Sequence, residues 1–326
     1  MIRFALIVAS TLGFVLTAAL GNLMTPLLRA FRVQQEENEP PTMGGLCLMV
    51  GTLAAVGVGW TAACVAQPEL LGTESLLTTR LLIALFGALL FGGVGLADDI
   101  ARIRRRSPLG LRRGTRLLLE AGAGAVVLVL LGANGCPAGG MALPGAGYVG
   151  LGVLAPLLWE AELVALAESV RITDEMDGLC CGTAFAAMLG LMLCMTVLGW
   201  FPLAVLPAAL AGALMAFLLW NFPPAKLRLG SVGSLFLAGA LGCIPLCIGW
   251  PDLALPLGLP YWLEGGMVFL QIVIYKLSHG RKQLFRTAPL HRWMEVRGSG
   301  SVQIFYAFCA AALLGAALAL QWAKIS

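Results

Sequence analysis

Two pairs of aspartates are the residues in this sequence whose type and spacing best suit chemistry. Asp98 and Asp99 are adjacent, and Asp174 and Asp177 are three positions apart, so the second pair shares one face of a helix. Neighbouring carboxylates repel each other, and Mg²⁺ would relieve that repulsion because it favours one or two carboxylates together with substrate phosphates. For the second pair, capping of a helix N-terminus is the structural alternative, because that end of a helix attracts negative charge.

Basic residues gather close to the first acidic pair. Seven arginines lie between Arg102 and Arg116. They have two interpretations, which we weight equally: topogenic charge resting on anionic lipid headgroups, and a surface that grips a phosphate group. Two acidic pairs facing one basic surface favour phosphoryl chemistry.

The composition shows what kind of chain must position these residues. Hydrophobic residues make up 59% of the 326 and charged residues only 12%, and the mean hydropathy is +0.90. A soluble domain has about twice that share of charged residues, and about 20 apolar residues are enough to cross a bilayer. We therefore expect an all-α integral membrane protein, a single polytopic domain over residues 1–326, with about ten transmembrane helices near 4–28, 43–65, 80–97, 117–133, 149–168, 179–198, 202–220, 232–250, 262–279 and 302–323.

The loops between the expected spans differ in charge. Of the 21 basic residues, 18 follow odd-numbered spans; the exceptions are Arg3, Arg80 and Lys324. Cytoplasmic loops carry the excess of Lys and Arg. This predicts that the basic face is cytoplasmic, that an active-site cleft opens there, and that both termini lie outside. The first apolar run has the start of a signal peptide, but it continues to about Leu28, which favours a retained span.

A second pair of acids favours a different class of protein. Glu160 and Glu162 fall inside an expected span, where ionised groups are costly and usually functional. An ion-coupled transporter is therefore one alternative, although no inverted repeat is visible in the sequence. Most of the nine cysteines lie within apolar runs and are interpreted as small buried residues.

Five motifs occur in order, each on an expected cytoplasmic loop. They are PTMGG at 41–45, GLADD at 95–99, TDEMDGL at 173–179, Asn221 followed by PA and GSVGSL up to 235, and FRTAPLH at 285–291 with Glu295 and Gly298. Together they resemble the polyprenyl-phosphate N-acetylhexosamine-1-phosphate transferase superfamily, glycosyltransferase family 4. The similarity is greatest to its phospho-N-acetylmuramoyl-pentapeptide transferase branch.

The resemblance implies a reaction and its partners. A phospho-N-acetylmuramoyl-pentapeptide, or a related phospho-N-acetylhexosamine, would pass from a UDP-sugar to undecaprenyl phosphate. The products would be a lipid-linked sugar pyrophosphate and UMP in peptidoglycan precursor synthesis, with Mg²⁺ as cofactor. The protein would be a phosphoglycosyl transferase in the bacterial plasma membrane, in contact with membrane lipids. A homodimer is left open, and no nucleic-acid partner is expected.

The resemblance also implies roles for individual residues. Asp98 would activate or orient the lipid phosphate, Asp99 would place metal and phosphate, and His291 would contact phosphate or its metal shell. Substrate-binding residues would be Asp174, Asp177, Asn221, Arg116, Thr42 and Gly44, and metal ligands would be Asp99 and Asp177.

The sequence departs from the family at several of these positions. Ser231 stands where the family has a metal-binding aspartate, and a neutral hydroxyl is a weaker Mg²⁺ ligand than a carboxylate. Glu168 and Arg171 replace asparagines and are spaced to pair with each other. The family's lysine before PTMGG is Glu37, its lysine after the aspartate pair is Arg116, and its histidine cluster is reduced to His291.

These departures leave two further hypotheses. Arg171 or Arg292 would supply part of the charge that a metal supplies elsewhere in the family. Alternatively, the chain is a catalytically impaired paralogue, a pseudoenzyme that binds a lipid or a partner protein. Losing a metal ligand can remove several kcal/mol of transition-state stabilisation, and each 1.36 kcal/mol is about a factor of ten in rate.

Overall fold

The computed structural model describes residues 2–30, 39–71, 76–105, 110–136, 139–143 and 147–325, and these are largely helical. The predicted loop position Glu37 lies outside the described residues. The helices are α1 (Ile2–Ala30), α2 (Gly45–Ala66), α3 (Leu76–Arg105), α4 (Arg113–Ala133), α5 (Leu154–Thr173), α6 (Leu179–Val197), α7 (Val205–Asn221), α8 (Gly230–Ile248), α9 (Ala254–Leu257), α10 (Leu259–Leu277), α11 (Leu290–Val296) and α12 (Ser301–Ile325). Short 3₁₀ turns cover Pro68–Leu71, Phe201–Ala204 and Pro251–Leu253.

The expected fold class is confirmed: the chain is an all-α, multi-pass membrane protein. Within the described residues, eight helices are long and apolar enough to cross a membrane, and a bent pair adds a ninth if it forms one span. Helix α5 does not reach this threshold, and it carries Glu160, Glu162, Glu168 and Arg171. The count of ten spans and the position of the termini stay predictions.

One expected boundary is displaced for a clear reason. The span expected at 149–168 begins only at Leu154 and continues to Thr173. Residues before it form an antiparallel hairpin, in which β1 (Gly140–Leu143) pairs with β2 (Gly147–Gly150). This hairpin follows α4 and was not predicted from the sequence.

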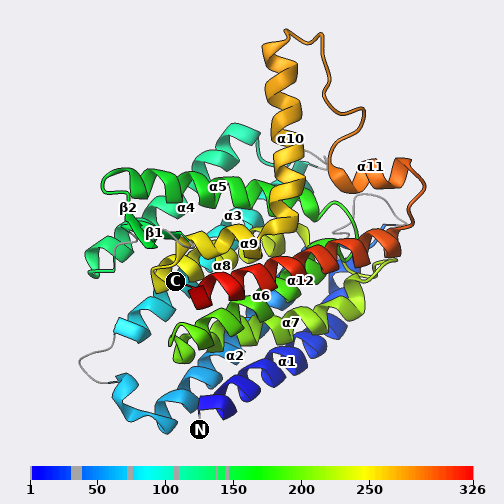
Figure 1. Ribbon diagram of the computed structural model, residues 1–326. Coiled ribbons are helices and arrows are strands. Elements are labelled where there is room, and N and C mark those ends of the chain that lie inside the picture. The colour runs from blue at the N-terminus through cyan, green and yellow to red at the C-terminus, as the bar shows by residue number, and fades with distance from the viewer. Residues whose placement is uncertain are drawn as a thin grey trace.

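Helix α8 is the centre of the bundle. All of its residues from Gly230 to Ile248 are buried, and it packs most extensively against α3. Small residues allow the two backbones to approach closely, because a Cβ added to Gly239 would lie 2.9 Å from the Cα of Ala88. Around this centre α1 packs on α7 and α2, and α12 packs on α6 (Figure 1).

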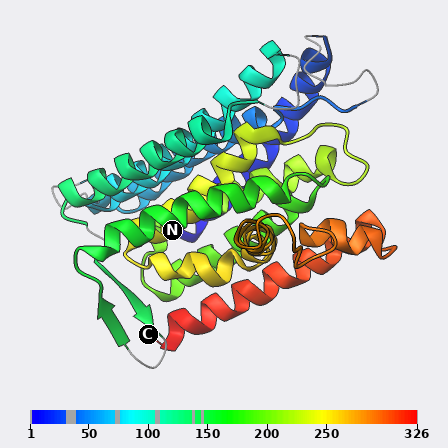
Figure 2. The ribbon, with the colours of Figure 1, turned by 90° about the horizontal axis from the view of Figure 1, so that it is seen from above.

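Helix α10 departs from the common direction of the bundle. It makes an angle of 83° with the preceding segment Pro251–Leu257. Its first part packs on α5, and its later part projects beyond the bundle (Figure 1), so that Figure 2 looks down its axis. Tyr261 and Glu264 in its first turns are fully buried, whereas Phe269 and Leu277 are exposed. The ninth expected span, 262–279, is therefore the second part of a bent pair.

Candidate active site

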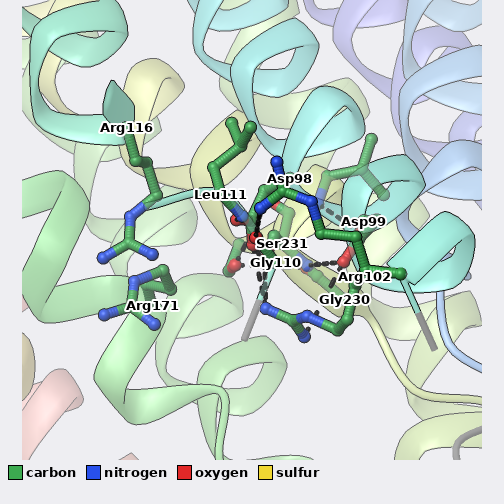
Figure 3. A network of polar contacts seen from close by, with 12 residues as sticks. Asp98, Asp99, Arg102, Gly110, Leu111, Arg116, Arg171, Gly230 and Ser231 are labelled. Carbon is green, nitrogen blue, oxygen red and sulfur yellow. Dashed lines mark hydrogen bonds and ion pairs between the residues drawn. The ribbon is translucent and has the colours of Figure 1, made fainter. Parts of the chain in front are cut away.

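The Asp98 carboxylate lies about two turns before the end of α3 and is fully buried. One oxygen, Oδ2, accepts hydrogen bonds from the Ser231 hydroxyl at 2.7 Å and from Nη2 of Arg102 at 2.9 Å. The other oxygen, Oδ1, accepts from the Leu111 backbone N–H at 2.7 Å. Figure 3 shows this carboxylate enclosed by its partners. Asp98 thus fixes Arg102 and Ser231 in place, and the loop at Leu111 with them.

Asp99, also fully buried, caps the N-terminus of α8 from a neighbouring helix. Its two oxygens accept hydrogen bonds from the backbone N–H groups of Ser231 at 3.2 Å and Val232 at 2.9 Å. This is the arrangement that a helix N-terminus favours, because its first N–H groups lack partners within the helix. Gly230 makes the approach possible: its φ is +77°, and a Cβ there would lie 2.8 Å from Oδ2 of Asp99.

A polar cavity opens beside these two acids. It has a volume of about 270 Å³. Three arginines from separate segments face it, together with three acids and the start of α8. The lining residues are Glu39, Pro40, Thr42, Arg102, Arg171, Asp174, Glu175, Arg228, Gly230, Ser231 and Ser234. Neither Asp98 nor Asp99 is among them. The cavity therefore presents guanidinium groups and a hydroxyl, while the aspartate pair supports them from behind.

Asp174 is the aspartate of the second pair that faces this cavity. It directly follows α5, and its side chain is only partly accessible. Removal from water raises its pKa well above the ordinary value, and the negative charge of Asp99 acts in the same direction. Arg102 and Arg228 oppose the shift. A carboxyl that more readily binds a proton opposes an incoming phosphate less.

Asp177 belongs to a second, adjoining cavity. This cavity has a volume of about 700 Å³, shares Glu175 and Arg228 with the first, and extends to Pro223 and Gly298. Asp177 accepts a hydrogen bond from the Ala225 N–H at 3.1 Å and lies 3.4 Å from Nε of Arg228. The two aspartates that the sequence groups together thus face two neighbouring spaces, with Arg228 between them.

Arg116 lies at the centre of an ionic cluster behind the first cavity. Its Nε donates to Oε1 of Glu168 at 3.0 Å and lies 3.6 Å from Glu120. Glu168 also pairs with Arg171 at 3.3 Å, which confirms the expected i, i+3 contact. Arg116 and Arg171 lie beside each other in Figure 3. Because Arg116 is buried and absent from both cavity linings, its placement favours positioning over the expected substrate contact.

The remaining expected substrate contacts are Thr42, Gly44 and Asn221, and they also divide into residues that line a cavity and residues that do not. Thr42 lines the first cavity. Gly44 does not, and its N–H donates to the carbonyl of Arg228 at 2.9 Å. Asn221 is buried and joins two loops: its side chain accepts from the Gly178 N–H at 3.1 Å and donates to the Leu227 carbonyl at 3.1 Å. Of these three, only Thr42 lines the first cavity, and ligand contacts of Gly44 and Asn221 stay predictions.

His291 is held away from both cavities. Its backbone N–H donates to Glu264 of α10 at 2.9 Å, and its Nδ1 lies 3.2 Å from the same carboxylate. The ring is buried. A contact between His291 and a phosphate stays a prediction, and in this structure the side chain joins α11 to α10.

The donor set does not fit the expected Mg²⁺. Among the described residues, no three His, Cys, Asp or Glu side chains are grouped to hold a metal ion. Asp99 directs both oxygens to backbone N–H groups, Asp177 faces the other cavity, and Ser231 contributes a neutral hydroxyl. The Arg102 guanidinium already approaches Asp98 and Ser231. A metal ion bound here would be repelled by this guanidinium, because two like unit charges 4 Å apart near a protein surface repel by about 4 kcal/mol.

Two arginines that line the cavity were not singled out as site residues from the sequence, although Arg102 belonged to the basic loop expected to grip a phosphate. Arg102 is four positions after Asp98 and three after Asp99, a spacing that places all three on one helix face and was a usable signal. Arg228 offered no comparable spacing, because its partners Asp177 and Glu39 come from distant segments. Of the two proposed metal substitutes, Arg171 lines the cavity, whereas the exposed Arg292 lies 3.9 Å from Glu175 and outside it.

Comparison with known proteins assigns this architecture to a class. Glycosyl transferase family 4 matches residues 81–249, which carry α3 to α8 and most of the cavity, and the chain belongs to this family. Among its relatives is the phospho-N-acetylmuramoyl-pentapeptide-transferase of Clostridium kluyveri, 29% identical over 94% of this chain and 95% of the relative. The enzymes of the same name from Moorella thermoacetica and Acaryochloris marina are 34% and 32% identical, over 84% and 93% of this chain and 81% and 83% of theirs.

Proposed function

We propose that this protein is a phosphoglycosyl transferase of the bacterial plasma membrane. It would transfer phospho-N-acetylmuramoyl-pentapeptide, or a related phospho-N-acetylhexosamine, from its UDP carrier to undecaprenyl phosphate. Relatives of that name cover most of the chain at 29–34% identity. The observation that carries the proposal is the cavity in which Arg102, Arg171 and Arg228 converge beside the start of α8.

The proposed reaction makes one phosphorus–oxygen bond and breaks another. An oxygen of the lipid phosphate attacks the sugar-bearing β-phosphorus, the bond to the bridging oxygen breaks, and UMP leaves with the electron pair. Such transfers depend on positioning and on charge stabilisation more than on covalent chemistry by the protein. Three guanidinium groups can bind phosphate oxygens through paired N–H donors. The adjoining second cavity gives the remainder of a large nucleotide-sugar space to bind.

Within this scheme the aspartates position the arginines. Asp98 holds Arg102, and Asp177 holds Arg228 across the boundary between the cavities. Asp174 faces the cavity directly and, with its raised pKa, is suited to hydrogen-bond a phosphate oxygen. We assign no step to Mg²⁺, because the residues present do not form its site.

A second candidate function is a catalytically impaired paralogue that binds lipid phosphate or a partner. One observation favours it: both oxygens of Asp99 are used in capping α8, and Ser231 offers no charge. The transporter alternative based on Glu160 and Glu162 has less support. Both acids lie on α5, away from the cavities, and the Glu160 carboxylate contacts Gly124 on α4.

The first experiment measures UMP release by the purified chain in detergent, supplied with UDP-N-acetylmuramoyl-pentapeptide and undecaprenyl phosphate, both with and without Mg²⁺. We expect turnover, and we expect Arg228→Gln to lower kcat/KM by about ten- to hundredfold, since a hydrogen bond to a charged group contributes about 1.5–3 kcal/mol. Folding should be little affected, because the ion pairs of Arg228 are half-exposed.

Lys324→Gln, at the exposed end of α12, is the control and should keep full activity. Absence of UMP release with several UDP-sugars, from protein that is folded and monodisperse, would reject the transferase. A gain of turnover in Ser231→Asp under those conditions would identify an impaired paralogue instead.

A further inference from the structure

The Arg102 guanidinium lies where Asp98 and Asp99 of α3 meet the start of α8. Nη2 is 2.9 Å from Asp98 and 3.1 Å from the Ser231 hydroxyl, and Nη1 is 3.9 Å from Asp99. The side chain is 21% exposed, and the exposed part faces the polar cavity. A single fixed positive charge thus contacts the three residues at which the family pattern would place its metal and phosphate chemistry (Figure 3).

Ser231 is the partner that makes this arrangement compatible with two buried aspartates. Its hydroxyl donates to Asp98 and accepts from Arg102, so it is matched to both neighbours. A carboxylate at this position would face Asp98 at hydrogen-bond distance, and the two negative charges would repel each other. A cation with more charge than one guanidinium would then be needed. The neutral hydroxyl of Ser231 and the single positive charge of Arg102 therefore match the two buried aspartates without such a cation.

We propose that Arg102 binds the diphosphate of the nucleotide substrate directly, and that it replaces the divalent cation in this chain. The inference rests on the proposed transferase function and names the residue that offsets diphosphate charge. Arginine is suited to this role because its planar fork matches phosphate oxygens and its charge persists at all physiological pH values. Arg171 lies at the same cavity and is the second cation available to the diphosphate.

The orientation of Arg102 supports a ligand on its cavity side. Asp98 and Ser231 engage Nη2 of the guanidinium, whereas Nη1 has a longer contact, the 3.9 Å ion pair with Asp99. The side chain is held from the end of α3 by an i, i+4 ion pair, so its position is fixed before a ligand arrives. Pre-positioned charge is the form of stabilisation that phosphoryl transfer uses most.

The test is binding of UDP to the full-length chain in detergent, measured by calorimetry in excess EDTA and again in Mg²⁺. UDP carries the diphosphate and requires no turnover. We expect the two dissociation constants to agree within about twofold. Arg102→Gln should weaken UDP binding by about ten- to hundredfold in EDTA, and Arg102→Lys should fall between. Arg104→Gln, an exposed arginine on the same helix, should bind UDP as the natural protein does.

A second measurement reports the metal without any ligand. Electron paramagnetic resonance should show no protein-bound Mn²⁺ in the natural chain and bound Mn²⁺ in Ser231→Asp. Loss of UDP binding in EDTA, tight Mn²⁺ binding by the natural chain, or failure of UDP to bind at all would each overturn the inference. UMP release that requires Mg²⁺ would reject this inference and leave the transferase intact. Metal-independent UDP binding without UMP release would support this inference and reject the transferase.

Discussion

Glu168 pairs with two arginines in different surroundings at the edge of the cavity. Arg116 behind it is buried, while Arg171 in front is one-quarter exposed and lines the cavity. Glu120 adds a second carboxylate near Arg116. Because one acid serves both arginines, the position of a cavity residue depends on a buried ion pair three residues away along α5.

Glu168→Gln should therefore destabilise the chain and displace Arg171 together. Removing one partner from a buried ion pair costs about 3–5 kcal/mol, and here the expected loss is at the lower end because the carboxylate is 15% exposed. Thermal unfolding in detergent measures the effect. Glu39→Gln removes a half-exposed partner of Arg228 and should change stability by no more than about 1 kcal/mol. Equal shifts in the two variants would contradict the cluster's buried character.

Sequence patterns at this scale identify residues better than they identify roles. The i, i+3 pairing of Glu168 with Arg171 was predictable because both lie on one helix. That Asp99 caps α8, and that Asn221 joins two loops, was not predictable, because their partners are 132 or 133 and 43 positions away. Tertiary hydrogen bonds of this kind leave no periodic signal.

At the scale of elements, α11 depends on α10 through one carboxylate. Glu264 accepts hydrogen bonds from the N–H groups of Leu290 and His291, which begin α11, and contacts the His291 ring. A second hydrophobic cluster, formed by Met176, Leu179, Ile304 and Phe308, packs against Leu290 and Met294 of the same helix. The connection between α10 and α12 is thus fastened at its midpoint.

Glu264→Ala should release α11 while leaving the bundle folded. The N–H groups of Leu290 and His291 would lose their acceptor, so amide hydrogen exchange in 285–298 should accelerate by about ten-fold or more, since an unmade buried hydrogen bond costs about 1–3 kcal/mol. Exchange in α8 should be unchanged. Mass spectrometry of the exchanged peptides measures both. Gln271→Ala, which removes only an acceptor of the Phe285 N–H, is the matched comparison.

Hydropathy predicted most elements closely and failed at two places for physical reasons. It gives the presence of an apolar run but not its direction, so the 83° bend before α10 was invisible. The hairpin at Gly140–Gly150 escaped notice because its strands are short and glycine-rich. Helix α5 was found despite its acids, and its start was misplaced by the adjoining strand.

At the scale of the whole molecule, the distribution of basic residues predicts which face is cytoplasmic. The structure supports one feature of this assignment, because Arg102, Arg171 and Arg228, from three expected cytoplasmic loops, converge on a single cavity. The loops thus share a face. Which side of the membrane that face occupies follows from the positive-inside rule and is open to direct measurement.

Cysteine labelling in intact cells tests the orientation. Of the nine natural cysteines, eight are buried and Cys309 is partly buried, so background labelling should be low. Gln67→Cys, in an exposed loop expected outside, should react with an impermeant maleimide. Arg104→Cys should react only after permeabilisation. The opposite pattern would invert the assigned topology, and labelling of both from outside would show that the loops do not share a face.

Helix α8 has a consequence for how the protein is made. Its most extensive partner is α3, and it also packs on α2 and α5, all of which precede it in the chain. Chains assemble from the N-terminus during synthesis, so these helices are already in the bilayer when α8 is synthesised. Helix α8 can therefore pack on them as soon as it enters the bilayer. The later helices α10 to α12 then join a centre that is already closed. All residues that line the first cavity, from Glu39 to Ser234, are thus synthesised before the segment that carries His291.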